Sequence, residues 1–372
     1  MYQILILLFI FQILVFIILL YKDIVKYKID FLLLKKRLFD YYKQSDILIH
    51  GVSCGEIQLL KSIVSIIEQK NISYSITSHT PTGYLLGKKF TKNIYLKPYE
   101  SFLTSFYLFY KVKPKKLIIS ESDSWPTYLI ISKLFGIEIM YINYKIKYNK
   151  PIRNLYHNIF ANKIFLKIEQ IKPWYLINKY KVLGNIKFLN HQLTEKKLLK
   201  NSIIFASAHI EEIAIHIKMF LQLEDYVLIY VPRNLNCKDE TINKLSKFNL
   251  NWCEDIDDIN KTKNKKIINI FWKFGILNKL YNITQITVMG GTFDNTGGHN
   301  IIEPIVNRNI ILVGNSLYTI MDLLDIFKVF QIKEDNVKDV LLNIDKSVIN
   351  DNIDIYNKYY KNIKNNLNQL ML

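Results

Sequence analysis

The chain has 372 residues, about the length of two domains on the usual prior of roughly 100–200 residues each. Hydrophobic residues make up 50% of the chain and aromatic residues 13%, which excludes an intrinsically disordered protein. The formal net charge of +18 by itself indicates an anionic partner: nucleic acid, anionic lipid or a phosphorylated substrate.

The type of basic residue weakens that indication, because only four are arginine: Arg37, Arg153, Arg233 and Arg308. The surplus of Lys, together with Ile, Asn, Tyr and Phe, is typical of a nucleotide-composition bias, so we interpret most lysines as solvated surface. The three cysteines, Cys54, Cys237 and Cys253, lack the spacing of metal ligands. They predict neither a disulfide framework nor a zinc site, which fits a reducing compartment.

The first predicted element is a membrane anchor. Residues 2–21 read YQILILLFIFQILVFIILLY and carry no charge, and twenty helical residues suffice to cross ~30 Å of hydrocarbon. Basic residues follow this run at positions 22, 26, 28 and 35–37. The positive-inside rule then places the rest of the chain in the cytoplasm, so we expect a single-pass anchor (1–21) in the inner membrane. A buried core helix is the alternative.

Beyond the anchor, short apolar runs rich in Ile and Val alternate with longer helical patterns. The predicted strands are 47–52, 73–77, 116–120, 203–207, 227–231, 267–270, 287–289 and 310–313. This alternation predicts βα units in open parallel sheets. We expect two Rossmann-like domains, 22–190 and 191–372, facing a cleft. Ligands of such sheets bind at the carboxyl ends of the strands.

The strongest local signal is GGTFDNTGGHNIIEP at 290–304, between a predicted strand and a predicted helix. A glycine-rich turn at that place exposes backbone N–H groups and suits a phosphate or carboxylate, although a plain tight turn is the alternative. Asn300 and Glu303 lie at the predicted helix start, where an acidic side chain usually binds a sugar hydroxyl. Arg233 follows another strand and suits bidentate phosphate binding; a surface arginine is the alternative.

Two carboxylate clusters mark the first half of the chain. In HGVSCGE at 50–56, Glu56 stands in the first predicted helical turn after a strand. It is either a partner of the helix dipole or the general base for a hydroxyl nucleophile, and composition does not decide between them. ESDSWP at 121–126 repeats the same geometry at a second strand end.

Taken in order, these motifs resemble the 3-deoxy-D-manno-octulosonic acid (Kdo) transferases of lipid A assembly. The resemblance covers nearly the whole chain. It rests on HGVSCGE (50–56), SHTPTG (78–83), YLKPYE (95–100), ESDSWP (121–126), GNIKF (184–188), ASAH (206–209), VPRN (231–234) and GGTFDNTGGHNIIEP (290–304). Each motif alone is weak, but eight in the family's order are highly specific.

The resemblance implies a GT-B fold with an N-terminal membrane anchor, and transfer of Kdo from CMP-Kdo to a lipid A precursor (lipid IVA) in lipopolysaccharide biosynthesis. It assigns general-base catalysis to Glu56, and transition-state stabilisation to Glu121 and Lys187. CMP contacts fall on Pro232, Arg233, Phe274, Gly275, Ile276, Asn300, Ile301, Ile302 and Glu303. A single displacement would invert the sugar without a metal or a cofactor, and the expected partners are CMP-Kdo, the lipid acceptor and the membrane.

The sequence departs from the family pattern at three places near the predicted site. Lys145 replaces an arginine, whereas Trp272 and Ile276 replace two acids. The alternative function is that of another membrane-associated GT-B glycosyltransferase acting on a lipid-linked acceptor. A nucleic-acid-binding protein is disfavoured, because the chain has no motif for it and its lysines are not gathered in one segment.

Overall fold

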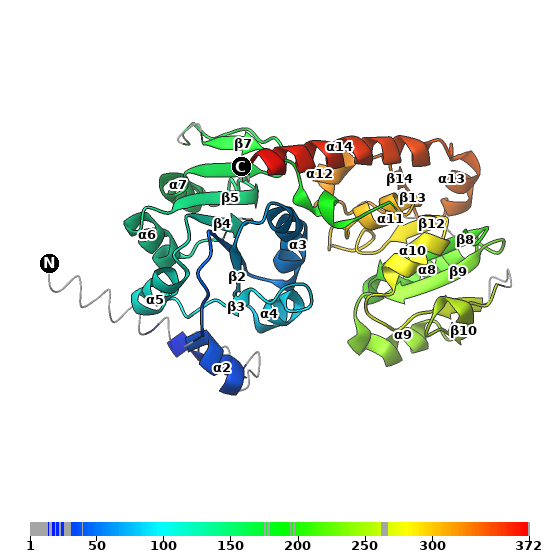
Figure 1. The fold of residues 1–372 in the computed structure, drawn as a ribbon. Coiled ribbons are helices and arrows are strands. Elements are labelled where there is room, and N and C mark those ends of the chain that lie inside the picture. The colour runs from blue at the N-terminus through cyan, green and yellow to red at the C-terminus, as the bar shows by residue number, and fades with distance from the viewer. Residues whose placement is uncertain are drawn as a thin grey trace. The chain divides into compact units, whose positions relative to one another are not determined.

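The chain folds into two compact units in a computed structural model (Figure 1). The structure describes residues 40–370 except 122, 175, 177, 178, 194, 196, 197 and 262–266, together with 31–38 and positions 14, 17, 18, 20, 21, 24 and 25. Unit 1 comprises the chain up to Asn190 and the segment from Lys361 onward, and unit 2 is His191–Tyr360. Most of the expected anchor lies outside the described residues. Within them, no helix has the length and apolarity needed to span a bilayer.

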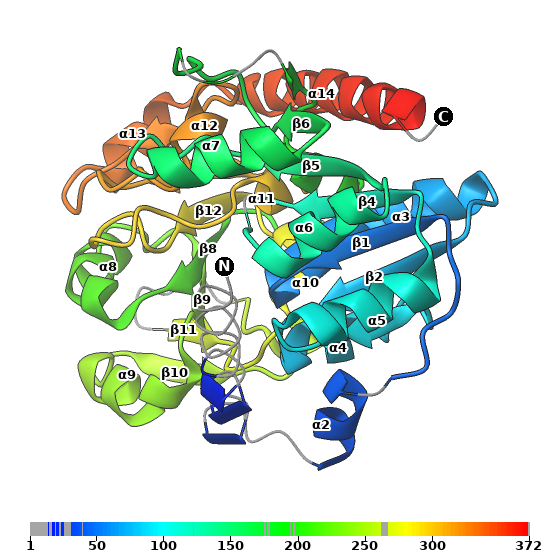
Figure 2. The same ribbon diagram turned by 90° about the vertical axis from the view of Figure 1, so that its left-hand side faces the viewer.

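Unit 1 is built on a seven-stranded parallel sheet in the order β3-β2-β1-β4-β5-β6-β7. Figure 2 shows β2, β1, β4 and β5 running side by side in this order. The strands are β1 (Ile47–Gly51), β2 (Tyr74–Ser78), β3 (Ile94–Leu96), β4 (Lys116–Ser120), β5 (Glu138–Tyr144), β6 (Lys163–Leu166) and β7 (Tyr180–Val182). The helices are α2 (Phe31–Leu38), α3 (Cys54–Gln69), α4 (Pro81–Gly87), α5 (Phe102–Val112), α6 (Pro126–Leu134), α7 (Pro151–Phe160) and the 3₁₀ helix η1 (Ile186–Asn190).

The helices of unit 1 cover both faces of its sheet, with α3 on one side and α6 and α7 on the other (Figure 1). Both faces of the inner strands are therefore buried, which explains why the strands read as continuous apolar runs. Local sequence signals begin the helices: the Thr80 hydroxyl accepts the Gly83 N–H at the start of α4, and the Ser101 hydroxyl accepts the Thr104 N–H at the start of α5.

Unit 2 repeats the architecture with the order β10-β11-β9-β8-β12-β13-β14, again all parallel. Its strands are β8 (Ser202–Ala208), β9 (Val227–Pro232), β10 (Asn249–Trp252), β11 (Ile267–Ile270), β12 (Ile286–Met289), β13 (Ile310–Val313) and β14 (Phe330–Gln331). Its helices are η2 (Ile210–Glu212), α8 (Ile213–Phe220), η3 (Leu235–Cys237), α9 (Lys238–Lys244), η4 (Ile256–Asp258), α10 (Leu277–Ile283), α11 (Ile302–Val306), α12 (Met321–Leu324), α13 (Val337–Asn343) and the first part of α14 (Val348–Leu370).

Side chains of successive residues in the central strand β8 enter two different cores. Ile203 and Phe205 pack in the core that includes residues of α8, whereas Ile204 and Ala206 pack in the core that includes residues of α10. Each core therefore lies against one face of the sheet, as in a doubly wound fold.

The C-terminal segment corrects one predicted boundary. Residues 361–372 were expected in the second domain, but the segment from Lys361 onward belongs to unit 1. The reason is that α14 is one long helix whose last turns are held by unit 1. Ile363 packs where a side chain on Gly184 would come within 2.5 Å, and the Lys70 ammonium donates to the Asn368 carbonyl over 2.7 Å.

Each sheet has one point at which the order of the strands reverses. In unit 1 the chain moves from β1 outward to β2 and β3, and then returns to place β4 on the other side of β1. In unit 2 the corresponding neighbours are β8 and β12. Ligands of doubly wound sheets bind beside the carboxyl ends of the strands at this switch point, so the segments after β1, β4, β8 and β12 are the places to examine.

Candidate active site

Glu56 lies at the switch point of unit 1, in the first turn of α3. The backbone N–H of Val52 donates to Glu56 Oε2 over 2.7 Å, and the Ser53 hydroxyl donates to Oε1 over 3.3 Å. These bonds turn the carboxylate back toward the end of β1 instead of leaving it to extend into solvent. The Ser-x-Gly-Glu spacing thus fixes the position of one acid by local backbone geometry.

Asp123 follows β4, and its side chain is hydrogen-bonded to the side chain of Glu56. Burial, followed by the negative charges of Asp123 and Glu121, raises the pKa of Glu56 to about 8. Burial also raises the pKa of Asp123, while the positive charges of Arg153 and Lys147 oppose that rise. Glu56 therefore keeps its proton to a higher pH than an ordinary carboxylic acid.

Glu121 stands where the chain leaves β4, in an unusual backbone conformation. Its φ is +58°, in the left-handed region that residues other than glycine rarely adopt, at a typical cost of ~1–3 kcal/mol. Its N–H donates to the Ile142 carbonyl on the neighbouring strand over 2.9 Å, which holds the bend. The bend brings the charge of Glu121 within electrostatic reach of both Glu56 and Asp123.

A buried polar chain supports the loop that carries Asp123. The Ser124 hydroxyl donates to Nε2 of His157, whose Nδ1–H donates to the Tyr144 hydroxyl over 3.0 Å, and Tyr144 donates to Asn154 Oδ1 over 3.2 Å. Burial, reinforced by the charge of Arg153, lowers the pKa of His157 to about 3, so the ring is neutral and can accept from Ser124. The loop is fixed by side chains of β5 and α7.

A buried ion pair also supports this loop. The Lys97 ammonium is fully buried, 2.6 Å from Glu100 Oε2 and 4.0 Å from the centroid of the Trp125 ring. Glu100 Oε1 accepts from the backbone N–H and the hydroxyl of Thr127, at the start of α6. The pair therefore ties the segment after β3 to the Glu121–Trp125 loop.

We expect Lys97→Met to destabilise the protein by about 3–5 kcal/mol, because Glu100 would remain as a buried charge without its partner. The double variant Lys97→Met/Glu100→Gln should recover a large part of that loss. Urea unfolding followed by fluorescence measures the effect. Lys115→Met, which removes the exposed pair with Asp46, is the control and should leave the midpoint unchanged. Equal midpoints for the two lysine variants would contradict the assignment.

Lys187, the predicted transition-state stabiliser, lies on η1 with its side chain exposed. η1 packs against α3, the helix that carries Glu56. The N–H of the preceding Ile186 donates to Oδ1 of Asn143 over 3.2 Å, and Asn143 has a φ of +55° at an irregularity in β5. Asn143 thus positions the Lys187 segment, a role that the sequence alone does not reveal.

In unit 2 the glycine-rich segment after β12 runs very close to neighbouring backbone. A Cβ on Gly290 would lie 2.1 Å from the carbonyl oxygen of Ser207, a residue of β8 with a φ of +54°. Gly291, Gly297 and Gly298 have φ values of +72°, +90° and +93°, which favour glycine. The glycines therefore allow this loop to lie against the end of β8.

His209, at the end of β8, contacts a carboxylate and a second histidine of that loop. His209, directly after β8, is 2.8 Å from Asp294 Oδ2 through its Nδ1, and 2.7 Å from His299 Nε2 through its own Nε2. The fully buried Glu212 accepts from the N–H groups of His209 and Phe293, both over 2.9 Å, and so fastens β8 to the loop. The sequence alone singles out neither His209 nor His299, although both stand in the motifs quoted above.

The described residues also offer a possible cation site, since donor atoms of His209, Glu211 and Asp294 lie within 4.8 Å of one another. The spacing favours hydrogen bonding instead. Ligands about 2.0–2.1 Å from one tetrahedral ion stand about 3.3 Å apart, whereas His209 approaches Asp294 and His299 to 2.8 and 2.7 Å. We therefore interpret this group as a hydrogen-bonded cluster.

Some of the predicted nucleotide-binding residues lie close to this loop. Arg233 follows β9 with an exposed side chain, and its charge acts on His299. Glu303, in the five-residue α11, has its pKa raised by burial, and a hydrogen bond with Asn300 opposes that rise. The helix expected after Gly298 is α11. Because α11 has only five residues, its dipole is weak.

The remaining predicted nucleotide residues differ in exposure. Ile301 and Ile302 are fully buried, so only their backbone could touch a ligand. Phe274 is 76% exposed and precedes Gly275, which has a φ of +80°, whereas Ile276 is buried at the start of α10. Pro232 is the buried last residue of β9.

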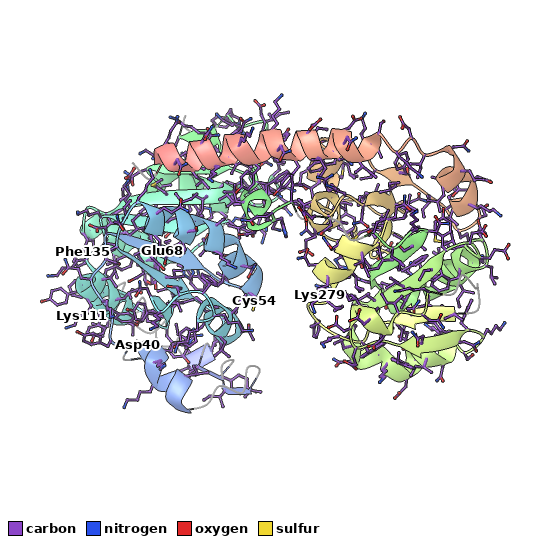
Figure 3. All side chains as sticks on the ribbon, turned by 45° about the vertical axis from the view of Figure 1, so that its right-hand side comes forward. Asp40, Cys54, Glu68, Lys111, Phe135 and Lys279 are labelled. Carbon is purple, nitrogen blue, oxygen red and sulfur yellow. The ribbon has the colours of Figure 1, made fainter. Side chains whose placement is uncertain are left out.

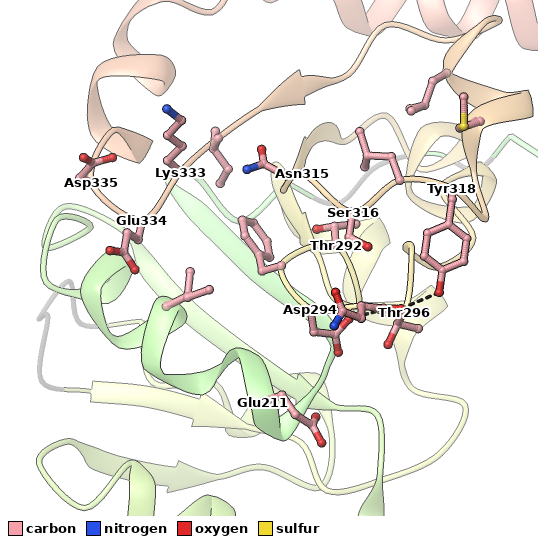
Figure 4. A pocket seen from close by; sticks show the side chains of 17 residues that line it. Glu211, Thr292, Asp294, Thr296, Asn315, Ser316, Tyr318, Lys333, Glu334 and Asp335 are labelled. Atoms are coloured by element: carbon pink, nitrogen blue, oxygen red, sulfur yellow. Dashed lines mark hydrogen bonds between the residues drawn. The ribbon is translucent and has the colours of Figure 1, made fainter.

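A cavity of about 1500 Å³ is lined in part by residues 292–296 of the glycine-rich loop (Figure 4). Glu211, Asp294 and Thr296 border it at one end, and Asn315, Ser316 and the 333–335 segment come from the ends of β13 and β14. None of the predicted nucleotide residues, all of which are described, lines it. The cavity therefore adjoins the cluster of His209, Asp294 and His299 through Asp294, and it does not coincide with the predicted nucleotide residues.

Comparison with known proteins agrees with these motifs. Residues 32–189 match the family model described as 3-deoxy-D-manno-octulosonic-acid transferase. The chain is 27% identical over 341 residues to a bifunctional glycosyltransferase/methyltransferase of Fusobacterium nucleatum, covering 82% of this chain and 53% of that protein. It is 28% identical over 224 residues to the 3-deoxy-D-manno-octulosonic acid transferase of Aquifex aeolicus, covering 57% and 59%. The chain thus spans little more than half the length of these two relatives.

Solved structures show the fold. A glycosyltransferase from Rickettsia africae superposes with a TM-score of 0.56 at 12% identity, covering 89% of this chain and 96% of that one. Anabaena HepE, solved in complex with UDP and glucose, gives a TM-score of 0.55 at 10% identity, covering 88% and 98%. The two parallel-sheet units have the GT-B fold. The family match over residues 32–189 and the relatives show that the chain is similar to 3-deoxy-D-manno-octulosonic acid transferases.

Proposed function

We propose that this protein transfers Kdo from CMP-Kdo to a sugar hydroxyl of a lipid A precursor in lipopolysaccharide biosynthesis. The observation that carries the proposal is Glu56, a carboxylate held at the switch point of the unit that matches the family model, with its pKa raised into the range of a general base. The relatives named as 3-deoxy-D-manno-octulosonic acid transferases supply the substrate class.

In the proposed reaction Glu56 removes the proton from the acceptor hydroxyl while its oxygen attacks the anomeric carbon of the donor. The C–O bond to CMP breaks as the new glycosidic bond forms, so one displacement inverts the configuration. Glu121 and Lys187, both carried by unit 1, are the proposed stabilisers of the charge that develops at the reacting sugar.

The donor is assigned to unit 2. Arg233 suits the phosphate because a guanidinium binds phosphate oxygens through two parallel hydrogen bonds. Asn300 and Glu303 are the proposed ribose contacts, and the segment 274–276 is the proposed neighbour of the base. The exposed backbone beside Gly275 and the partly exposed Glu303 carboxylate support these assignments.

A lipid acceptor requires that the protein reach the membrane surface. Besides the proposed anchor at 2–21, unit 1 exposes aromatic and aliphatic side chains of α5, α6 and the residue after α6. They are Phe102, Leu103, Phe106, Tyr107, Tyr110, Ile130, Leu134 and Phe135. α5 and α6 contain no acidic residue, and Lys111 and Phe135 lie on the same side of unit 1 (Figure 3). Such a surface suits the interface of an anionic membrane.

The direct test is an assay of membranes containing the full chain with CMP-Kdo and a tetraacylated lipid A precursor. Release of CMP together with a Kdo-bearing lipid supports the proposal. Transfer from another nucleotide sugar, with none from CMP-Kdo, would establish the alternative of a different GT-B glycosyltransferase.

The pH dependence of transfer should report the Glu56–Asp123 pair. Because the base must be deprotonated, kcat/KM should rise with pH until it passes the pKa of Glu56, about 8. Asp123 raises that pKa through its charge and its hydrogen bond, so Asp123→Asn should move the rising limb to lower pH. Asp46→Asn, in an exposed pair, should leave the profile in place. A profile unmoved by Asp123→Asn would refute the coupling.

A further inference from the structure

We propose that His157 is a positioning residue for the transfer reaction, because it fixes the end of β5 and with it the places of Glu121 and Lys187. The inference rests on the proposed function, in which Glu121 and Lys187 stabilise the charge at the reacting sugar. His157 lies in α7, and its side chain is fully buried within unit 1. It therefore acts through other side chains and not on a substrate.

Two successive residues at the end of β5 hold the two proposed stabilisers. The Ile142 carbonyl accepts the Glu121 N–H over 2.9 Å. Oδ1 of Asn143 accepts, over 3.2 Å, the N–H of Ile186, the residue directly before Lys187. The backbone positions of Glu121 and Lys187 therefore depend on the conformation of one short stretch of β5.

That stretch is irregular, so pairing with β6 does not by itself fix it. The register between β5 and β6 shifts between Tyr141 and Tyr144, and Asn143 has a φ of +55°. An irregularity of this kind disrupts the ladder of hydrogen bonds and changes the direction of side chains. Side-chain contacts are then needed to hold the backbone, and Tyr144, the last residue of β5, is bound by His157.

The hydrogen bonds around His157 run in one direction, which fixes its tautomer. Nδ2 of Asn154 donates to the Lys147 carbonyl over 2.9 Å, so Oδ1 of Asn154 is the atom that accepts from the Tyr144 hydroxyl, over 3.2 Å. The oxygen of Tyr144 then accepts the Nδ1–H of His157 over 3.0 Å. This leaves Nε2 of the ring unprotonated, as the acceptor for the Ser124 hydroxyl.

The same ring is held against the segment after β4. It stacks on the Tyr141 ring with the centroids 4.7 Å apart, and the Tyr141 hydroxyl donates to the Asp123 carbonyl over 3.1 Å. Burial lowers the pKa of His157 to about 3, so the neutral ring keeps both of its hydrogen bonds at neutral pH. One side chain thus ties the segment that carries Glu121 to the strand end that holds Lys187.

His157→Phe tests the assignment, because phenylalanine fills a similar volume but makes neither hydrogen bond. In membranes containing the full chain, with CMP-Kdo and the lipid acceptor, we expect kcat to fall by about 10–100-fold, the loss that a displacement of ~1 Å can cause. KM for CMP-Kdo should change by less than about threefold, since the proposed donor contacts belong to unit 2. His157→Gln, whose amide still offers an acceptor and a donor, should recover most of kcat.

Tyr74→Phe is the matched control for the loss of a buried hydrogen bond. It removes a hydroxyl 2.8 Å from Thr91 Oγ1 at the amino end of β2, so it should lower the urea midpoint but leave kcat unchanged. A purely structural role for His157 predicts the same pattern for His157→Phe, with lower stability and an unchanged kcat. That result would overturn the proposal while the proposed function stands.

A double-mutant cycle with Lys187→Met shows whether His157 acts through the site. If His157 serves to place Lys187, less is left to displace once the ammonium is gone. The double variant should then lose much less activity than the product of the two single losses. Losses that multiply would overturn the proposal. Absence of transfer by the wild-type protein would overturn it together with the proposed function.

Discussion

Glu56→Gln is expected to lower kcat for sugar transfer by about 10²–10⁴-fold, the usual contribution of a general base. The amide cannot take a proton from the acceptor hydroxyl, but its oxygen can still accept from the Val52 N–H that holds the start of α3. Folding should therefore survive, and removing one charge from a crowded carboxylate cluster should not lower stability. Turnover of CMP-Kdo with saturating lipid acceptor measures the loss.

The same variant should bind CMP as the wild type does, because the proposed nucleotide contacts all belong to unit 2. Glu68→Gln is the matched control: it lies at the other end of α3 (Figure 3), where its carboxylate accepts from the Tyr74 hydroxyl. It should retain full transfer activity. Transfer by Glu56→Gln at the rate of the control would rule out Glu56 as the base, whatever its effect on stability.

Much of the framework could be predicted because sequence patterns and local structure coincide. The apolar runs at 47–52, 116–120 and 203–207 became β1, β4 and β8 to within one or two residues. The position of Glu56 could be predicted as well, since the residues that fix it are its own neighbours, Val52 and Ser53. Such features depend on contacts only a few residues apart.

Other parts of the site depend on distant contacts and could not be read from the sequence. The coupling of Glu56 to Asp123 arises only because β1 and β4 are neighbours in the sheet. The left-handed backbone of Glu121 has no signature in a residue of that type, whereas asparagine, as at 143, adopts it more readily. The pairing of His209 with His299 likewise needs β8 to lie beside β12. In these cases the residues can be picked out in the sequence, but the order of the strands in the sheet determines which residues contact one another.

The prediction that the second domain extends to the C-terminus was wrong for a similar reason. Nothing in the composition of 348–370 marks the point at which α14 leaves unit 2, because the helix continues without interruption. What assigns its end to unit 1 is the close approach of Ile363 to Gly184, together with the hydrogen bond from Lys70 to the Asn368 carbonyl. The reason for a glycine at position 184 becomes clear only in the structure, where the Ile363 side chain occupies the space that a Cβ would need.

Gly290→Ala should be the most damaging small substitution in unit 2. The added methyl group would lie 2.1 Å from the Ser207 carbonyl oxygen and 2.8 Å from the Ala208 Cα, and backbone atoms cannot move aside as a flexible side chain can. We expect a loss of about 3 kcal/mol in stability, at the upper end of overpacking effects. The shift would also separate the glycine-rich loop from the end of β8, so CMP binding should be lost.

Gly136→Ala separates this steric effect from the general cost of replacing a glycine. Gly136 has a φ of +69°, and apart from its chain neighbours no heavy atom lies within 4 Å of the place that a Cβ would take. Its replacement should therefore cost only the ~1–2 kcal/mol of a left-handed conformation. It lies in unit 1, so CMP affinity should stay unchanged. Thermal unfolding and CMP titration of both variants decide the matter. If Gly290→Ala kept its CMP affinity, the close contact of β8 with the glycine-rich loop would not be what shapes the proposed phosphate site.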